Sequence, residues 1–360
     1  MNRIRKTKAA SFLIGTLPVG CKLCIEGKKL VIFITGLCKL PEMCAHYCPI
    51  SEERKGKNVI FANDRPVTSF EDVLVEVKKM NAKGAGITGG DPLLVIDKTL
   101  NYISMLKKQF GDQFHIHLYC CSSPHLTIEN LKRLKQAGLD EIRFHVEENQ
   151  WSLMVDAKKI GFTVGAEVPA INLDELKKLG LFLSKNQLDF FNINEFEFSE
   201  TNADALRKKG FTLKKDSLVA INGSEKVTMD FMNWALNKLT INIHFCTTSL
   251  KDGFQFKNRM KRTAKNVKKP YEVVTDDGLL LKGIISWENE DEKLRIKTLI
   301  EENFEIPEEL YFWNEKMERL EIHWKILDES FSLFKKYNLK CGIVQELSDF
   351  LQTSIRYDPY

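Results

Sequence analysis

A chain of 360 residues is long enough for one α/β domain of roughly 200–250 residues and a smaller second domain. Its composition, with 43% hydrophobic and 28% charged residues, is that of an ordinary globular protein. No apolar run reaches the ~18–20 residues of a membrane span, so we expect a cytoplasmic protein with no membrane partner. The net charge of +4 is modest, so a nucleic-acid partner has to be indicated by local clusters of cations.

The first two-thirds of the chain alternates short β-branched runs with stretches of helical period. The clearest helix is expected over residues 69–82, where the apolar side chains fall on one face. Strands are expected over residues 30–35, 84–88, 114–120, 141–146, 162–168, 189–196 and 241–246. This alternation is typical of parallel βαβ units and predicts an α/β fold, namely a complete or partial TIM-like (β/α) barrel. A doubly wound open sheet is the alternative, because periodicity does not report whether a sheet closes.

The composition changes beyond the last expected strand. Residues 257–269 hold seven Lys or Arg and no acid, and a β-hairpin is expected around Asp276, Asp277 and Gly278. Acidic and helix-like stretches follow, which predicts a small C-terminal α+β domain. We therefore expect a cysteine-bearing N-terminal extension over residues 1–27, a barrel domain over 28–265 and an accessory domain over 266–360.

Three cysteines lie on the loop after the first expected strand. The chain has nine cysteines and is too large to need disulfides for stability, which favours metal or redox chemistry. Cys38, Cys44 and Cys48 form a C-x5-C-x3-C cluster. Three thiolates on one loop can hold three irons of a [4Fe–4S] cluster and leave the fourth iron open. A zinc site and buried free thiols are the alternatives, and zinc is better suited by a tight pair such as Cys21-x2-Cys24.

A second motif, Thr88-Gly89-Gly90-Asp91-Pro92, follows the next expected strand. With these two motifs, about residues 28–250 resemble the radical S-adenosylmethionine (SAM) superfamily. The branch that they resemble most is a poorly characterised one related to glycyl-radical (pyruvate formate-lyase) activating enzymes. That superfamily has a three-cysteine loop with an aromatic residue before the last cysteine, here Tyr47, and then a Gly-Gly-Glu-Pro-like motif. This chain departs from it by longer gaps between the cysteines and by Asp91 in place of Glu.

The resemblance implies a radical SAM enzyme, an oxidoreductase in the broad sense. A [4Fe–4S] cluster on the three cysteines would cleave SAM reductively with an electron from an external low-potential donor. The 5′-deoxyadenosyl radical would then abstract hydrogen from a substrate over the barrel mouth. The residues that the resemblance places near the cofactor or substrate are Tyr47, Thr88, Gly89, Gly90, Asp91, Glu167, Asn192 and Asn194.

Further residues carry weaker expectations. Cys21, Cys24 and Cys246 are candidates for an auxiliary metal site, either a second iron–sulfur cluster or zinc, with structural thiols as the alternative. The cations Lys257, Arg259, Lys261 and Arg262 predict contacts with phosphates, and hence RNA modification with tRNA as the substrate. Activation of a glycyl-radical enzyme, a protein substrate, is the alternative, and a non-catalytic iron–sulfur or zinc RNA-binding protein is a third. His115, His117 and His145 are expected to satisfy buried hydrogen bonds.

Overall fold

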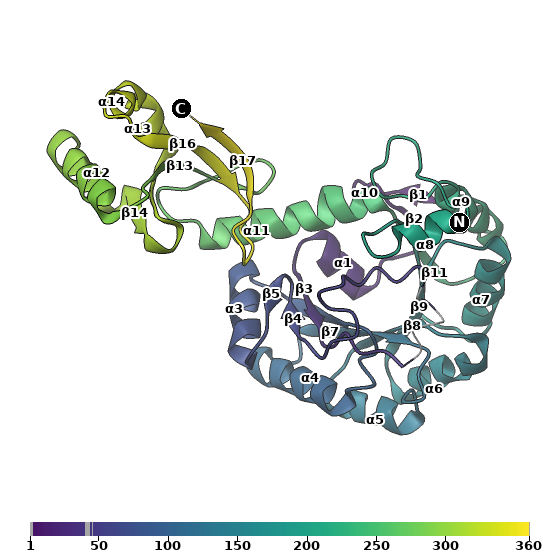
Figure 1. Ribbon diagram of the computed structural model, residues 1–360. Helices are drawn as coiled ribbons and strands as arrows, with labels where there is room; N and C mark the ends of the chain where they lie inside the picture. The colour runs from purple at the N-terminus through teal and green to yellow at the C-terminus, as the bar shows by residue number, and fades with distance from the viewer. Residues whose placement is uncertain (1–2, 40–43, 45, 360) are drawn as a thin grey trace. The chain divides into compact units, whose positions relative to one another are not determined.

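The computed structural model describes residues 3–39, 44 and 46–359 (Figure 1). The chain divides into two compact units. The first comprises the chain up to Lys78 and Ala82–Phe256, and the second comprises Lys79–Asn81 and Lys257–Tyr360. This division lies at residues 256/257 and not at the expected 265/266, because helix α11 (Lys257–Val267) groups with the second unit. The expected N-terminal extension is not a separate part, since its strand β2 pairs with the sheet of unit 1.

Unit 1 is built on an 11-stranded sheet with a parallel centre. The parallel strands, in spatial order, are β3 (Lys29–Phe33), β6 (Gly84–Thr88), β7 (His115–Cys121), β8 (Glu141–His145), β9 (Thr163–Pro169), β10 (Phe190–Asn194) and β11 (Asn242–Cys246). Short antiparallel strands flank both ends of this order: β4 (Phe61–Ala62) and β5 (Arg65–Pro66) beyond β3, and β2 (Phe12–Ile14) and β1 (Arg5–Lys6) beyond β11. In the described part of the chain β3 and β11 are therefore not paired with each other. The predicted α/β fold is confirmed, and the barrel is a partial one.

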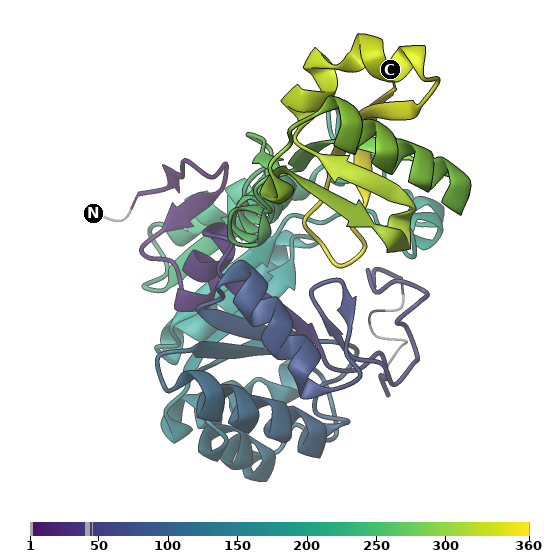
Figure 2. The same ribbon diagram turned by 90° about the vertical axis from the view of Figure 1, so that its left-hand side faces the viewer.

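The helices between successive parallel strands are α3 (Phe70–Met80), α4 (Ile96–Phe110), α5 (Ile128–Gln136), η1 (Glu148–Gln150), α6 (Ser152–Ile160), α7 (Leu173–Lys185), α8 (Ala203–Lys208) and α9 (Ser224–Ala235). Helices α3 to α7 lie on the outer side of the curved sheet (Figures 1 and 2). Two short helices, α10 (Thr248–Leu250) and η2 (Lys251–Phe256), follow β11. The face of α3 that the sequence predicted to be apolar is the one that is buried, with Val73, Val77 and Met80 each at most 3% exposed. No helix in the described residues is long and apolar enough to cross a membrane.

One helix lies on the inner side of the sheet. Helix α1 (Val19–Ile25) contacts β3, β6 and β7, and Figure 1 shows it within the curve of the strands. A Cβ atom at Gly20 would lie 2.6 Å from Nδ1 of His117 and 2.6 Å from Nη2 of Arg143. Glycine at this position therefore lets the helix approach the polar side chains inside the partial barrel.

Unit 2 is an antiparallel sheet with helices, which confirms the predicted small α+β domain. The 6-stranded sheet has the order β14 (Tyr311–Asn314), β15 (Arg319–Ile322), β13 (Leu280–Ser286), β16 (Lys340–Glu346) and β17 (Ser354–Pro359), and β12 (Val273–Val274) pairs with β13. The helices are α11, α12 (Glu290–Asn303), η3 (Glu308–Leu310), η4 (Glu315–Met317), α13 (Trp324–Glu329) and α14 (Phe331–Lys336). Strands β12 and β13 form the hairpin expected around Gly278.

A buried charge cluster lies on the sheet of unit 2. The side chain of Lys282 is 1% exposed, and its Nζ lies 2.9 Å from Oε1 of Glu272. The same nitrogen lies 3.0 Å from carboxylate oxygens of Glu321 and Glu346. Arg319 bridges these last two carboxylates at 2.6 and 2.7 Å. Each charge is tolerated in the interior only because the others compensate it.

We expect Lys282→Met to destabilise the protein by about 3–5 kcal/mol, since three carboxylates would keep only Arg319 as a buried cation. Lys340→Ala is the control, because its ion pair with Glu288 is exposed and is expected to contribute less than about 1 kcal/mol. Urea unfolding followed by tryptophan fluorescence measures both, since Trp287, Trp313 and Trp324 lie in unit 2. Equal losses for the two variants would contradict the expected role of the cluster.

Candidate metal centre and adjoining cleft

The glycine motif holds the start of the cysteine loop by backbone hydrogen bonds. Beyond the ends of β3 and β6, Gly90 N donates to Thr35 O at 2.7 Å and Asp91 N donates to Leu37 O at 2.8 Å. These bonds continue the pairing of the two strands past their ends. Cys38, which follows Leu37, is therefore placed by the motif after β6.

Both glycines of the motif are required by close backbone contacts. A Cβ atom at Gly89 would lie 2.4 Å from Thr35 O, and one at Gly90 would lie 2.3 Å from Leu37 O. Gly89 also has a φ of +156°, which side chains rarely allow. In the described structure, the space that these glycines leave is filled by the cysteine loop.

Asp91 fixes the turn that follows β6. Its side chain is buried, with Oδ1 accepting a hydrogen bond from Leu93 N at 2.9 Å and Oδ2 accepting one from Ser123 Oγ at 2.6 Å. Both carboxylate oxygens are thus occupied by protein donors. Ser123, at the start of the loop after β7, was not singled out from the sequence.

The thiols of the loop interact with one another and with a fourth cysteine. A hydrogen bond from the Cys44 thiol lowers the pKa of Cys48 to about 6, against the effect of burial and with help from the backbone N–H of Ile50 and the charge of Lys55. Cys121, the last residue of β7, is hydrogen-bonded to Cys38, and this bond together with burial raises the pKa of the Cys121 thiol. The Cys121 thiol also donates to Gly90 O at 3.8 Å.

The end of the cysteine loop is tied to two other segments. The Tyr47 hydroxyl lies 3.3 Å from Nε2 of His145 at the end of β8, and the two rings stack with centroids 6.0 Å apart. Ahead of α8, Thr201 donates a hydrogen bond to Cys48 O and Asn202 donates one to Tyr47 O, both at 3.1 Å. A single sequence carries no signal for Thr201 and Asn202, because they act on backbone carbonyls about 150 residues away.

A cleft of about 610 Å³ adjoins this end of the loop. It lies at the carboxyl ends of β8 and β9 and reaches the start of α7. Its lining includes His46, Tyr47, His145, Trp151, Pro169 and Glu175. The volume suits a small organic ligand, and clefts at the carboxyl ends of parallel strands are the usual ligand sites of such folds.

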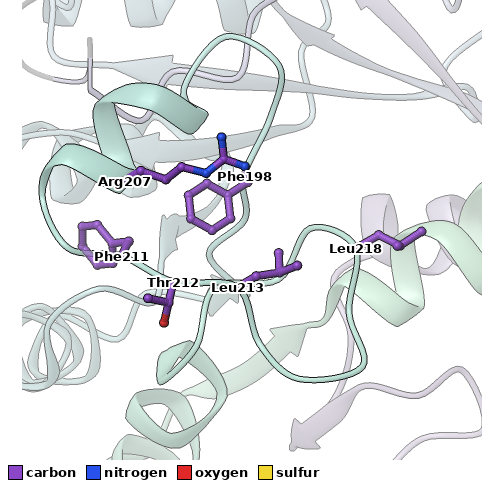
Figure 3. Close-up of a pocket in the computed structure, with 6 residues that line it drawn as sticks. All are labelled: Phe198, Arg207, Phe211, Thr212, Leu213 and Leu218. Carbon is purple, nitrogen blue, oxygen red and sulfur yellow. The ribbon is translucent and has the colours of Figure 1, made fainter.

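A second hollow, of about 350 Å³, lies beside α8 (Figure 3). Its lining residues are Phe198, Arg207, Phe211, Thr212, Leu213 and Leu218, and the guanidinium of Arg207 lies 5.7 Å from the centroid of the Phe198 ring. The lining has no cysteine, histidine or carboxylate. The metal-binding and acid–base groups of unit 1 therefore lie elsewhere.

The polar residues expected late on the strands do come together. Glu167 of β9 accepts hydrogen bonds from Asn192 Nδ2 at 3.0 Å and Asn194 Nδ2 at 3.2 Å, both on the neighbouring strand β10. Burial opposes ionisation of Glu167, but Arg143 at 2.7 Å and the two amides lower its pKa to about 2. The three predicted residues thus form one buried network with Arg143.

The candidate auxiliary cysteines lie near enough for the Cys21 and Cys24 thiols to act on the pKa of Cys246, but each has its own environment. Cys21 accepts a hydrogen bond from Asn192 Nδ2 at 3.2 Å, and Cys246 accepts one from Gln255 Nε2 at 3.7 Å. Burial raises the pKa of Cys21 to about 11. Among the described residues, no group with all its ligand atoms within 4.8 Å of one another includes Cys21, Cys24 and Cys246. A compact zinc site is therefore not formed by these three thiols.

Lys257 and Arg262, of the four candidate phosphate ligands, have protein partners whose contacts are as follows. Lys257 pairs with Asp277 at 2.6 Å, and Arg262 donates to Met80 O at 2.6 Å and to Asn81 O at 2.8 Å. All of these residues except Met80 are exposed or partly exposed. These contacts therefore bind this part of α11 to other residues of unit 2.

Comparison with known proteins gives one substantial match. No family model matches the sequence. A Methanocaldococcus jannaschii protein named "Putative glycyl-radical enzyme activating enzyme MJ0021" is 45% identical over 301 residues, which cover 80% of this chain and 78% of that protein.

Solved structures give weaker matches. Streptococcus suis SuiB is 14% identical, with a TM-score of 0.39, over 61% of this chain and 49% of that one. HydG, a maturase of the [FeFe]-hydrogenase, is 12% identical, with a TM-score of 0.41, over 68% of this chain and 65% of that one. Likeness at this level does not identify a function.

In metal-free protein we expect Cys48 to be alkylated by iodoacetamide with a half-maximal rate near pH 6, the value of its lowered pKa. Cys44→Ala removes the hydrogen bond that stabilises the Cys48 thiolate, so its pKa should rise. Alkylation at pH 7 should then be about threefold slower, since the loss of thiolate outweighs its higher nucleophilicity. Mass spectrometry of the labelled peptide measures the rate. Cys120→Ala is the control, and an unchanged profile in Cys44→Ala would refute the pairing.

Proposed function

The chain belongs to the family of glycyl-radical enzyme activating enzymes, a branch of the radical SAM superfamily, and we propose that Cys38, Cys44 and Cys48 hold its [4Fe–4S] cluster. The cofactors of such an enzyme are this cluster and SAM. The observation that carries the assignment is the contact between the two motifs, in which the backbone of Gly90 and Asp91 binds the segment before Cys38. A metal-binding cysteine must be deprotonated, and the lowered pKa of Cys48 supports that role.

We assign the cleft beside Tyr47 and His145 to SAM. It adjoins the cysteine loop, and its volume of about 610 Å³ is sufficient for a nucleoside. When bound, the cluster supplies the electron for reductive cleavage of SAM. An external low-potential donor then has to return one electron to the cluster. Trp151 and Tyr47 offer aromatic surface to the ligand, and Glu175 offers a hydrogen-bond acceptor. The oxygen sensitivity of such a cluster suits a reducing compartment such as the cytoplasm.

The residues around the motifs have positioning roles in this proposal. Thr88, Gly89, Gly90 and Asp91 hold the cysteine loop against β6. Glu167, Asn192 and Asn194 hold one another and Arg143 across strands β8, β9 and β10. The resemblance alone suggested that the residues of both groups contact the cofactor directly. In this proposal they position other parts of the chain instead.

We propose a protein glycine as the source of the abstracted hydrogen. The relative at 45% identity is named for the activation of glycyl-radical enzymes, and in such a step the hydrogen atom passes from a glycine Cα to the 5′ carbon of cleaved SAM. The product is a protein radical and 5′-deoxyadenosine. The methionine half of SAM leaves as methionine, and its sulfur takes up the electron that the reductant supplies.

RNA is the second candidate substrate, because residues 257–269 carry seven cations and no acid. Two of its expected ligands, Lys257 and Arg262, bind protein groups, which weakens this alternative. The two candidates differ in where the hydrogen originates.

Deuterium transfer distinguishes them. Host proteins labelled with [α-²H]glycine, and separately host RNA labelled with deuterium, are incubated anaerobically with the full chain, SAM and dithionite. We expect deuterium in 5′-deoxyadenosine from the protein pool and a glycyl-radical signal by electron paramagnetic resonance. Cys38→Ala is the control and should release no 5′-deoxyadenosine, since one iron ligand is lost. Deuterium from the RNA pool alone would identify RNA, and not a protein, as the substrate. Cleavage of SAM by Cys38→Ala would refute the assignment of Cys38 as a cluster ligand.

We expect Gly90→Ala to lose about 1–3 kcal/mol of stability and to reconstitute with less iron than the wild type. The new methyl group would overlap Leu37 O, so the segment before Cys38 must move. Gly253→Ala is the matched control, because a Cβ atom there meets nothing within 4 Å. Colorimetric iron analysis and urea unfolding measure the two effects. Iron content equal to that of Gly253→Ala would contradict the clamping role.

A further inference from the structure

A group of potential metal ligands lies at the other end of the parallel sheet from the cysteine loop. His115 is the first residue of β7 and Glu141 is the first residue of β8. The register places His117 beside Glu141, and His115 shares the face of His117 because side chains alternate along a strand. One ligand atom from each of these three residues lies within 4.8 Å of the other two. They are the one group of this kind among the described residues.

The ligand atoms of this group are buried, and those of His117 lack hydrogen-bond partners in the described part of the chain. His117 and Glu141 are 0% exposed. Both ring nitrogens of His117 have no hydrogen-bond partner, whereas Nε2 of His115 and Oε2 of Glu141 face each other at 3.4 Å. His145, by contrast, has the Tyr47 hydroxyl. The expectation that these histidines satisfy buried hydrogen bonds is thus wrong for His117, and unpartnered buried groups of this kind cost about 1–3 kcal/mol each.

The surroundings fix the carboxylate of the group. Burial, with the charges of Arg143 and Lys29, holds the pKa of the His117 imidazole well below its usual range. Arg143 donates from Nε to Oε1 of Glu141 at 2.6 Å, which leaves Oε2 for another partner. That oxygen lies 3.4 Å from Nε2 of His115.

Two further charges face the group. Asp140 Oδ2 lies 3.9 Å from Nδ1 of His115 and is itself paired with Lys107 at 2.8 Å. A carboxylate beside the second nitrogen of a ligand histidine is a common outer partner in metal sites. Arg143 and Lys29 are the nearby cations. The carboxylates of Glu141 and Glu167 interact with Arg143, and that of Glu167 also interacts with Lys29.

We propose that His115, His117 and Glu141 bind one divalent first-row metal ion, with zinc as the expected occupant. Two imidazoles and one carboxylate are a ligand set of zinc, and iron(II) accepts the same set. The site is separate from the iron–sulfur centre, since a strand rises about 3.3 Å per residue and His115 is six residues before Cys121, hence roughly 20 Å away. The ion joins the start of β7 to the start of β8, where Gly20 of α1 approaches His117.

This inference does not depend on the proposed function, and its test removes the iron of the cluster. The background is the full chain with Cys38, Cys44 and Cys48 all changed to Ala. After dialysis against zinc and then metal-free buffer, elemental analysis should find one zinc per chain. His117→Ala in this background should lose it, whereas His244→Ala should keep it. His244 is a matched control because it is also a buried histidine of the barrel, 2% exposed.

A second variant covers the case in which His117→Ala does not fold. Glu141→Gln keeps the shape of the side chain and should weaken cobalt(II) binding, read from the visible d–d bands, at least roughly tenfold. Iron in place of zinc, lost in the same variants, would support the site with the other occupant. No bound metal in the background protein, or equal metal in His117→Ala and His244→Ala, would overturn the proposal.

Discussion

The close approach of two backbone segments is the constraint on which the candidate site depends. Gly89 and Gly90 carry no Cβ, so Thr35 O and Leu37 O can accept hydrogen bonds from the backbone beyond β6. Asp91 then binds Ser123 beyond β7. The carboxyl ends of three successive strands are joined in this way, and the start of the cysteine loop is held where the sheet ends.

The partial barrel separates two kinds of polar site along its strands. The carboxyl end carries the cysteine loop and the cleft, where partly exposed groups can meet a ligand. The interior is charged, with Arg143 between Glu141 and Glu167, and α1 covers it. Buried ion pairs of this type contribute little net stability, but removing one partner is costly, so they oppose alternative packings of the strands. A cation bound to His115, His117 and Glu141 would belong to the same network.

The cysteines illustrate how environment separates residues of one type. Cys48 receives a hydrogen bond from Cys44 and becomes a thiolate near neutral pH, whereas burial keeps Cys21 protonated. Deprotonated thiols are the metal ligands, and within the loop it is Cys48 whose pKa is lowered, whereas the same hydrogen bond raises the pKa of the Cys44 thiol. Cys121 joins it through Cys38, although 83 residues separate the two in the chain.

Local pattern was sufficient for the parallel strands, the helix α3, the β12–β13 hairpin and the two motifs, because each depends on periodicity or on residues adjacent in sequence. Glu167, Asn192 and Asn194 were singled out by the resemblance to the radical SAM superfamily, and their hydrogen bonds to one another are a tertiary finding. Only the tertiary structure decided the contacts of Thr201 and Asn202 with the cysteine loop, and the meeting of His117 with Glu141. These depend on strand register and on hydrogen bonds to backbone atoms, which leave no mark in the residue types of a single chain. That β3 pairs with β4, and β11 with β2, in place of pairing with each other in the described chain was likewise a tertiary outcome, since periodicity is the same in open and closed sheets.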